Sequence, residues 1–98
     1  MRVLLRVPRA LATDLGGARE VGLDVVGYAG AAPTVRDVLD AAAAAHPALG
    51  RRLRDEQGGL RRFVNVYLAG EEVRRLRGLD TPVPTGTDVD VVQSVAGG

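Results

Sequence analysis

The chain has 98 residues, of which 46% are hydrophobic and 26% are charged, and its net charge is +1. This composition predicts one small domain with a single core rather than a disordered chain, and the charge is too small to favour nucleic acid as a partner. The absence of cysteine excludes a disulfide scaffold, a thiolate metal site and a cysteine nucleophile.

The N-terminal sequence gives no sign of export or membrane insertion. The apolar start of the chain is interrupted by Arg6 and Pro8, so we predict no signal peptide. No apolar stretch approaches the roughly 18 residues of a membrane span. We therefore expect a cytoplasmic protein that forms one domain over residues 1–98.

The first third of the chain predicts two strands. Apolar residues alternate with other residues over 2–7 and again over 20–25, as in strands with one buried face. Residues 9–18 have weak periodicity and contain two adjacent glycines, so we predict a turn or loop there. The two strands should pair in antiparallel fashion, and residues 28–33 should form another loop.

The clearest predicted helix begins after Pro33. Thr34 is a good N-cap, and Asp37 stands three residues later, as in a capping box. The apolar stripe of this helix consists of Val35, Val38, Leu39, Ala42 and His46. Pro47 should end the helix or begin a short second turn in which Leu49 and Leu53 pack. Residues 51–62 are polar, and we predict a mobile loop for them.

The second half of the chain predicts strands at residues 63–68, near Val73 and at 88–95, with an irregular segment over 75–84. The fold class is therefore α+β, with a mixed sheet and one main helix packed on one of its faces. We expect the first and last strands to be adjacent, parallel and central. The residues facing the helix should be Val3, Leu5, Val7, Val21, Leu23, Val64, Val66, Leu68, Val89 and Val91.

The chain finishes with Val95, Ala96, Gly97 and Gly98, a narrow segment almost without side chains that we expect to form a flexible tail. With the strand order above, this ending resembles the ubiquitin-like β-grasp sulfur carriers, which include the molybdopterin-synthase small subunit and the thiamine-pathway carrier. Residues 62–68, followed by 71–74, are most similar to the sulfur carrier of actinobacterial cysteine biosynthesis. The resemblance is good over residues 60–98 and weaker over 1–59.

The resemblance implies a carrier rather than an enzyme. A partner adenylyltransferase of the ubiquitin-activating type would use ATP to adenylate the carboxylate of Gly98, and a sulfur donor would then leave a thiocarboxylate. The carrier itself would bind no cofactor and no metal. The sulfur acceptor would be a pyridoxal-phosphate cysteine synthase or, alternatively, the large subunit of molybdopterin synthase. Because the sequence stops at Gly98, we expect the carboxylate to be ready for activation without trimming.

A docking face for these partners is predicted on the sheet face away from the helix. Four apolar residues should lie there, namely Leu4, Phe63, Tyr67 and Val92. The alternative is that they are scattered, or that residues 75–84 cover them.

The remaining polar residues are less informative. Arginines cluster at 51–62 and at 74–77. They are expected to form a solvated face, and the alternative is that they steer the protein toward an acidic surface of a partner. His46 is expected to favour a helix C-terminus, and a triad with Ser94 has little support. Two further functions stay open, a protein modifier joined to target lysines through Gly98 and a β-grasp adaptor with an inert tail.

Overall fold

The computed structural model describes residues 1–94, so the predicted tail at 95–98 lies outside the described residues. Five strands form one sheet in the order β2-β1-β5-β3-β4. Their bounds are Arg2–Arg6 for β1, Glu20–Asp24 for β2, Val64–Leu68 for β3, Glu71–Glu72 for β4 and Val89–Gln93 for β5.

The first and last strands lie side by side at the centre of the sheet, as predicted. β1 pairs with β5 in parallel, with Leu5 opposite Val89 and Arg6 opposite Asp90. The other three pairings are antiparallel, β1 with β2, β3 with β4 and β3 with β5. The sheet is therefore mixed, and β5 runs between two neighbours that fix its direction toward residue 94.

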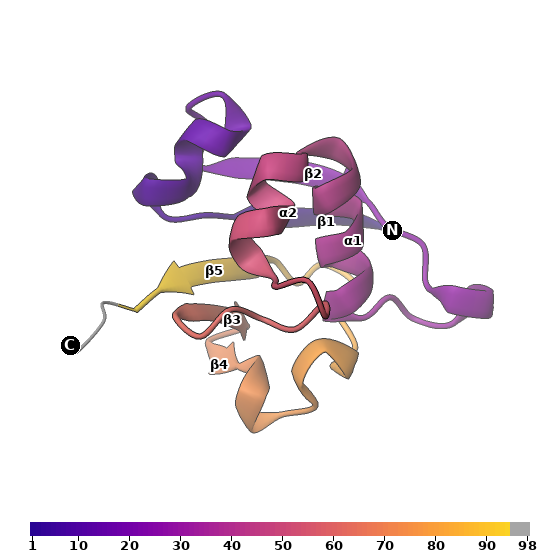
Figure 1. Cartoon of the computed structure of the whole chain (residues 1–98). Coiled ribbons are helices and arrows are strands. Elements are labelled where there is room, and N and C mark those ends of the chain that lie inside the picture. Colours follow the sequence, from indigo (N-terminus) through magenta and orange to yellow (C-terminus); the bar gives the residue numbers. More distant parts are fainter. Residues whose placement is uncertain (95–98) are drawn as a thin grey trace.

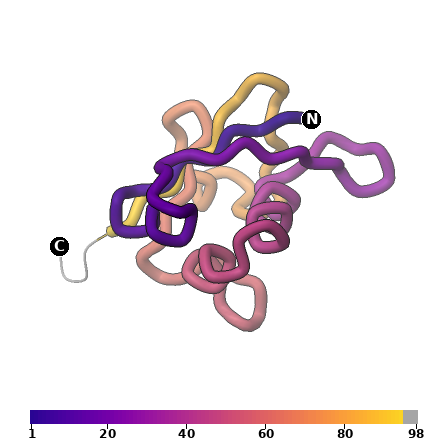
Figure 2. Tube along the Cα trace, turned by 90° about the horizontal axis from the view of Figure 1, so that it is seen from above, coloured from indigo at the N-terminus to yellow at the C-terminus, as the bar shows by residue number. Residues whose placement is uncertain are grey.

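Two helices cover one face of the sheet, α1 at Val35–Ala45 and α2 at Pro47–Leu53 (Figures 1 and 2). The predicted capping box is present at the start of α1. The backbone N–H of Asp37 donates to Thr34 Oγ1 at 3.3 Å, and the backbone N–H of Thr34 donates to Asp37 Oδ2 at 2.8 Å. These two bonds satisfy donors that have no partner within the helix, so they fix where α1 begins.

We expect Thr34→Ala to lower the free energy of unfolding by about 1 kcal/mol, because one reciprocal bond of the capping box is lost. Urea unfolding followed by circular dichroism measures this change. Thr13→Ala is the matched control, since Thr13 is exposed and its hydroxyl makes no hydrogen bond within residues 1–94. Equal stabilities for the two variants would contradict the role of the capping box.

The predicted core is confirmed. Nine of the ten residues expected to face the helices are buried, and Val21 is half-buried. They pack with the apolar stripe of α1 and with Leu49 and Leu53 of α2. Because these residues alternate along the strands, the intervening side chains lie on the other face of the sheet.

The prediction of a turn or loop over residues 9–18 is wrong for residues 9–15, while residues 16–17 do form a turn. Residues Arg9–Leu15 form a 3-10 helix, η1, which ends at Gly16 in the left-handed conformation with φ of 68°. Leu11 and Ala12 are buried, and Arg52 of α2 contacts Asp14 at 3.1 Å. The helix forms because its apolar side chains gain burial against α2 and the strand edge, which the weak periodicity of the sequence did not reveal.

The predicted mobile loop at 51–62 also needs correction. Residues 51–53 belong to α2, and the following turn is organised by Asp55. Its Oδ1 atom accepts from the backbone N–H groups of Gln57 and Gly59, each at 3.0 Å. Arg54 and Leu60 form an isolated β-bridge across this turn. The polar side chains therefore build a specific hydrogen-bonded turn.

Two further boundaries differ from the prediction. The short strand expected near Val73 is β4, and Val73 itself begins a 3-10 turn, η3, at Val73–Arg75. Two other short 3-10 turns lie in predicted irregular segments, η2 at Tyr28–Gly30 and η4 at Gly78–Asp80. Over residues 1–94, no helix has the length and hydrophobicity needed to cross a bilayer.

Candidate functional site

The sheet face opposite the helices, called here the outer face, carries the alternate residues of each strand. Four side chains form one row across this face. Arg6 pairs with Glu20 on one side and with Asp90 on the other, and Asp90 pairs with Tyr67. Leu4 lies on one side of this row, opposite Gly22. The opposite side of the row leads to the end of β5, where the predicted tail begins.

Arg6 is the centre of an ion-pair network on the outer face. Its guanidinium lies 3.6 Å from Glu20, 2.7 Å from Asp88 and 3.2 Å from Asp90. Arg6 therefore links β1 to β2, to β5 and to the residue before β5. Hydrogen bonds to Asp90 and then Asp88 raise the pKa of Arg6 above its ordinary value. Because the pKa of Arg6 is higher in the folded than in the unfolded protein, the stabilisation that its charge gives the fold is complete below the unfolded-state pKa. This stabilisation is lost only at higher, strongly alkaline pH. The guanidinium of Arg6 therefore stays charged across the ordinary pH range.

Two exposed apolar side chains meet at the end of β5. Phe63 is 39% exposed and Val92 is 44% exposed. The backbone N–H of Ser94 donates to the carbonyl oxygen of Phe63 at 2.8 Å, and Val92 pairs with Asn65, so Phe63 and Val92 are diagonal neighbours on this face. The guanidinium carbon of Arg62 lies 5.4 Å from the centre of the Phe63 ring, within cation–π range.

A chain of polar side chains borders this apolar pair. Arg74 Nη1 donates to Asn65 Oδ1 at 2.9 Å, and Asn65 Nδ2 donates to Ser94 Oγ at 2.5 Å. Arg74 Nη2 also donates to the carbonyl oxygen of Arg61 at 3.1 Å. These bonds connect η3, β3 and the residue after β5, so they fix the last described residue of the chain against the sheet.

The four predicted docking residues all lie on the outer face, but they do not form one continuous patch. Phe63 and Val92 are adjacent at the end of β5. Tyr67 is half-buried in the row of Arg6, and Leu4 lies beyond that row. Residues 75–76 border Tyr67, while the later part of the 75–84 segment packs beside α1 through the Val35–Thr81 and Val83–Pro33 backbone bonds. That segment therefore leaves Phe63 and Val92 exposed.

The two arginine clusters of the sequence are regrouped by the fold. Arg54 contacts Asp40 at 2.8 Å, and Arg52 contacts Asp14, so both tie α2 to its neighbours. Arg61 instead contacts Arg74, and Arg62 lies over Phe63, both next to β3. Four of the five arginines of the first cluster thus divide into a structural pair, Arg52 and Arg54, and a pair before β3, whereas Arg51 is exposed on α2.

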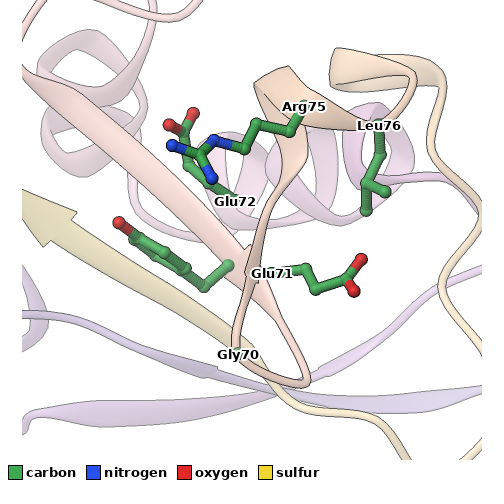
Figure 3. A pocket seen from close by; sticks show the side chains of 6 residues that line it. Gly70, Glu71, Glu72, Arg75 and Leu76 are labelled. Atoms are coloured by element: carbon green, nitrogen blue, oxygen red, sulfur yellow. The ribbon is translucent and has the colours of Figure 1, made fainter.

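An open surface pocket of about 480 Å³ lies at the edge of the sheet beside β4. Figure 3 shows Glu72 and Arg75 on one side of this pocket and Glu71 and Leu76 on the other. Glu72 Oε2 is buried and makes no hydrogen bond within the described residues; its nearest cation is Arg74 at 3.7 Å. The pocket extends the candidate surface around the edge of the sheet.

The other candidates of the sequence are placed apart. His46 is the C-cap of α1, and its backbone N–H donates to the carbonyl oxygen of Ala42 at 2.7 Å. Ser94 follows β5 and bonds Asn65 in the sheet. His46 and Ser94 therefore belong to different layers and form no triad. Within residues 1–94, no group of three or more His, Cys, Asp or Glu side chains could hold a metal ion.

Sequence reasoning did not find the Arg6 network or the bonds that join Asn65, Arg74 and Ser94. Each polar residue occupies an outward position in an alternating strand or follows a strand, which was the only available signal. Their partners come from segments far apart in the sequence, so the register of the sheet was needed to bring them together. Gly97 and Gly98, with Ala96 and Val95, lie outside the described residues.

A five-stranded mixed sheet with its helices on one face and a central parallel pair of β1 and β5 is the architecture of the ubiquitin-like β-grasp proteins. Solved β-grasp structures superpose on this chain with TM-scores of 0.80. The profile of the ThiS family matches residues 20–98, so the chain belongs to this family of ubiquitin-like sulfur carriers.

Similar proteins cover most or all of the chain. The sulfur carrier protein CysO of Mycobacterium tuberculosis is 32% identical over 100 residues, covering 100% of both chains. Small archaeal modifier protein 1 of Haloferax volcanii is 35% identical over 85 residues, covering 87% of this chain and 88% of that protein. A chain in the crystal structure of the Amycolatopsis orientalis BexX/CysO complex is 33% identical, with a TM-score of 0.80 and coverages of 98% and 99%.

Proposed function

We propose that this protein carries sulfur as a thiocarboxylate on Gly98, after a partner enzyme has used ATP to adenylate the terminal carboxylate. The observation that supports this most directly is the match of the ThiS family to residues 20–98, which includes the Gly97-Gly98 ending. A carboxylate is a poor electrophile, and adenylation gives it a good leaving group. The chain would supply a docking face and a narrow tail, while the partner would supply ATP and the chemistry.

The acceptor that we propose is an enzyme of cysteine biosynthesis, most simply a pyridoxal-phosphate cysteine synthase. Support comes from the full-length similarity to the carrier CysO. A structural neighbour of this chain was crystallised in a BexX/CysO complex, which supports binding to a partner protein. Sulfur held on a positioned tail is delivered as a nucleophile at high effective concentration.

A second candidate function is that of a protein modifier joined through Gly98 to lysines of other proteins. The 35% identity with small archaeal modifier protein 1 favours it. The chain contains no lysine, so chains of the protein linked to itself through lysine are not possible. The two functions share the activation step and differ only in the nucleophile that receives the activated tail.

Intact-mass analysis tests the proposal. The protein is incubated with ATP, an adenylating enzyme of the ubiquitin-activating type and a sulfur source. We expect the mass to rise by the difference between one sulfur and one oxygen atom. A stable adduct with another protein would indicate the modifier instead. An unchanged mass, with an enzyme that activates another ThiS-family protein under the same conditions, would contradict the proposal.

Phe63→Ala is expected to weaken binding to the activating enzyme by about tenfold or more. Phe63 lies beside Ser94, the residue that precedes the tail, and an exposed aromatic side chain is a typical interface anchor. Isothermal calorimetry with the adenylating enzyme measures the affinity. The control is Tyr28→Ala, since Tyr28 is 88% exposed on the loop that projects from the opposite end of the molecule (Figures 1 and 2). An unchanged affinity for Phe63→Ala, with circular dichroism showing an intact fold, would remove Phe63 from the docking face.

A further inference from the structure

Two arginine-bearing segments come together along β3, where Arg74 reaches the start of the strand and Arg75 lines the pocket beside β4. Arg61 and Arg62 precede β3, while Arg74 and Arg75 end η3. Arg74 joins the two segments through its bond to the carbonyl oxygen of Arg61 at 3.1 Å. All four residues are exposed, and they are called here the arginine corner.

Two members of the arginine corner are held by bonds within the chain, and two are not. Arg61 Nε donates to the carbonyl oxygen of Arg51 at 2.7 Å, and Arg74 is bonded to Asn65. Arg62 and Arg75 have no carboxylate within 4.0 Å in the part of the chain that the structure describes. Arg62 instead lies over the Phe63 ring and Arg75 lines the open pocket, so no carboxylate among these residues pairs with either charge.

The surface around the sheet is divided by charge. Its β2-β1-β5 part carries four carboxylates against two guanidinium groups, from Glu20, Asp24, Asp88 and Asp90 against Arg2 and Arg6. The arginine corner has four guanidinium groups, and Glu72 is the one carboxylate paired with them among residues 1–94. The net charge of +1 conceals this separation. Such a distribution orients a charged partner, because like-charge contacts oppose the reversed arrangement.

We propose that the arginine corner binds an acidic surface of the protein that activates the tail, with Phe63 and Val92 as the apolar centre of the contact. This inference rests on the proposed function, since a protein that receives residues 95–98 must lie close to Ser94. Arginine and aromatic side chains are the residues that interfaces enrich. An acidic protein surface fits better than RNA, because the carboxylates of the neighbouring part repel phosphates and one aromatic ring offers little stacking.

The first experiment compares two double variants with equal changes of charge. Arg62→Glu/Arg75→Glu reverses the unpaired charges of the arginine corner. Arg2→Glu/Arg36→Glu is the matched control, because both residues are exposed and lie at the start of β1, the opposite end from Ser94, and in the first turn of α1. Association with the adenylating enzyme is followed by stopped flow at low and high salt. We expect the first variant to associate about tenfold more slowly at low salt and to lose most of its salt dependence, whereas the control stays near the unmodified protein.

The second experiment does not require activation of the tail. The protein is titrated with a short peptide of alternating aspartate and phenylalanine, and backbone amide shifts are measured by nuclear magnetic resonance. We expect the largest shifts at Arg62, Phe63, Arg75 and Val92, and their loss in Arg62→Glu/Arg75→Glu. A peptide of alternating lysine and phenylalanine is the control and should leave these amides unshifted.

Several outcomes would overturn the inference. Equal slowing of both double variants would show a general effect of net charge, and peptide shifts centred elsewhere would exclude the arginine corner. Tighter binding of an RNA oligonucleotide than of the acidic peptide at the same amides would make this a nucleic-acid surface. A salt-dependent dimer that Arg62→Glu/Arg75→Glu abolishes would identify a second copy as the occupant. Peptide binding without any gain of mass would instead support the acidic contact and contradict the proposed function.

Discussion

Gly97→Leu is expected to reduce formation of the thiocarboxylate by at least about a hundredfold, because displacing a reacting group by even 1 Å can cost that much in rate. In the proposed function this segment enters the active site of an adenylating enzyme, and the leucine side chain would widen it, whereas glycine leaves the backbone free of any Cβ. Adding one alanine after Gly98 should have a similar effect, since it moves the carboxylate by roughly 3.3–3.6 Å. Intact-mass analysis at a series of times after addition of ATP measures both rates.

The control for the tail is a glycine that the fold does not require. Gly59→Ala fits, because a Cβ at this position would make only ordinary contacts of 3.6 Å and longer with Asp55. It should form the thiocarboxylate at the unmodified rate. A Gly97→Leu protein that binds the enzyme normally and still gains sulfur at the unmodified rate would refute the central role of the tail.

Leu5→Ala is expected to lower the free energy of unfolding by about 3 kcal/mol, since Leu5 is fully buried between the sheet and the helices. For a domain of this size, each kcal/mol corresponds to roughly 4–8 °C in melting temperature. Such a loss is a large part of the stability of a small domain. Urea unfolding monitored by circular dichroism, with an unchanged slope against denaturant, is the appropriate measurement.

Leu4→Ala removes the same atoms from the opposite face of the same strand, so it is the matched comparison. Leu4 is half-buried on the outer face, and we expect a loss of about 1 kcal/mol or less. The difference between the two variants reports the register of β1 directly, because a shift by one residue would exchange their environments. Equal losses in the free energy of unfolding would contradict the assignment of Leu5 to the buried face and of Leu4 to the outer face.

The sequence predicted the sheet well, because its strands carry the strongest period-two pattern. The residues around Val3 and Val89 alternate clearly, and their apolar content placed both strands at the centre of the sheet, which the structure confirms. The capping box at Thr34 marked the start of α1 for a local reason that needs no tertiary structure. Features decided within about four residues, or by burial on one face, were therefore predictable.

Features that depend on tertiary contacts were not predictable. The η1 helix is stabilised by burial of Leu11 and by the contact of Asp14 with Arg52, which is distant in sequence. The regrouping of Arg61 with Arg74 likewise depends on the pairing of β3 with its neighbours. The docking residues illustrate both cases, since alternation placed Phe63 and Val92 on the outer face, while the charged row that separates them from Leu4 required the register.

The position of β5 between β1 and β3 has a consequence for biosynthesis. When the ribosome has released only the first 88 residues, β1 and β3 have no neighbour to join them, and the two halves of the sheet are unconnected. Pairing of β1 with residues more than 80 positions away makes closure a late and non-local event during folding. A nascent or truncated chain without β5 should thus leave the facing edges of β1 and β3 unpaired and be cleaved more readily by proteases.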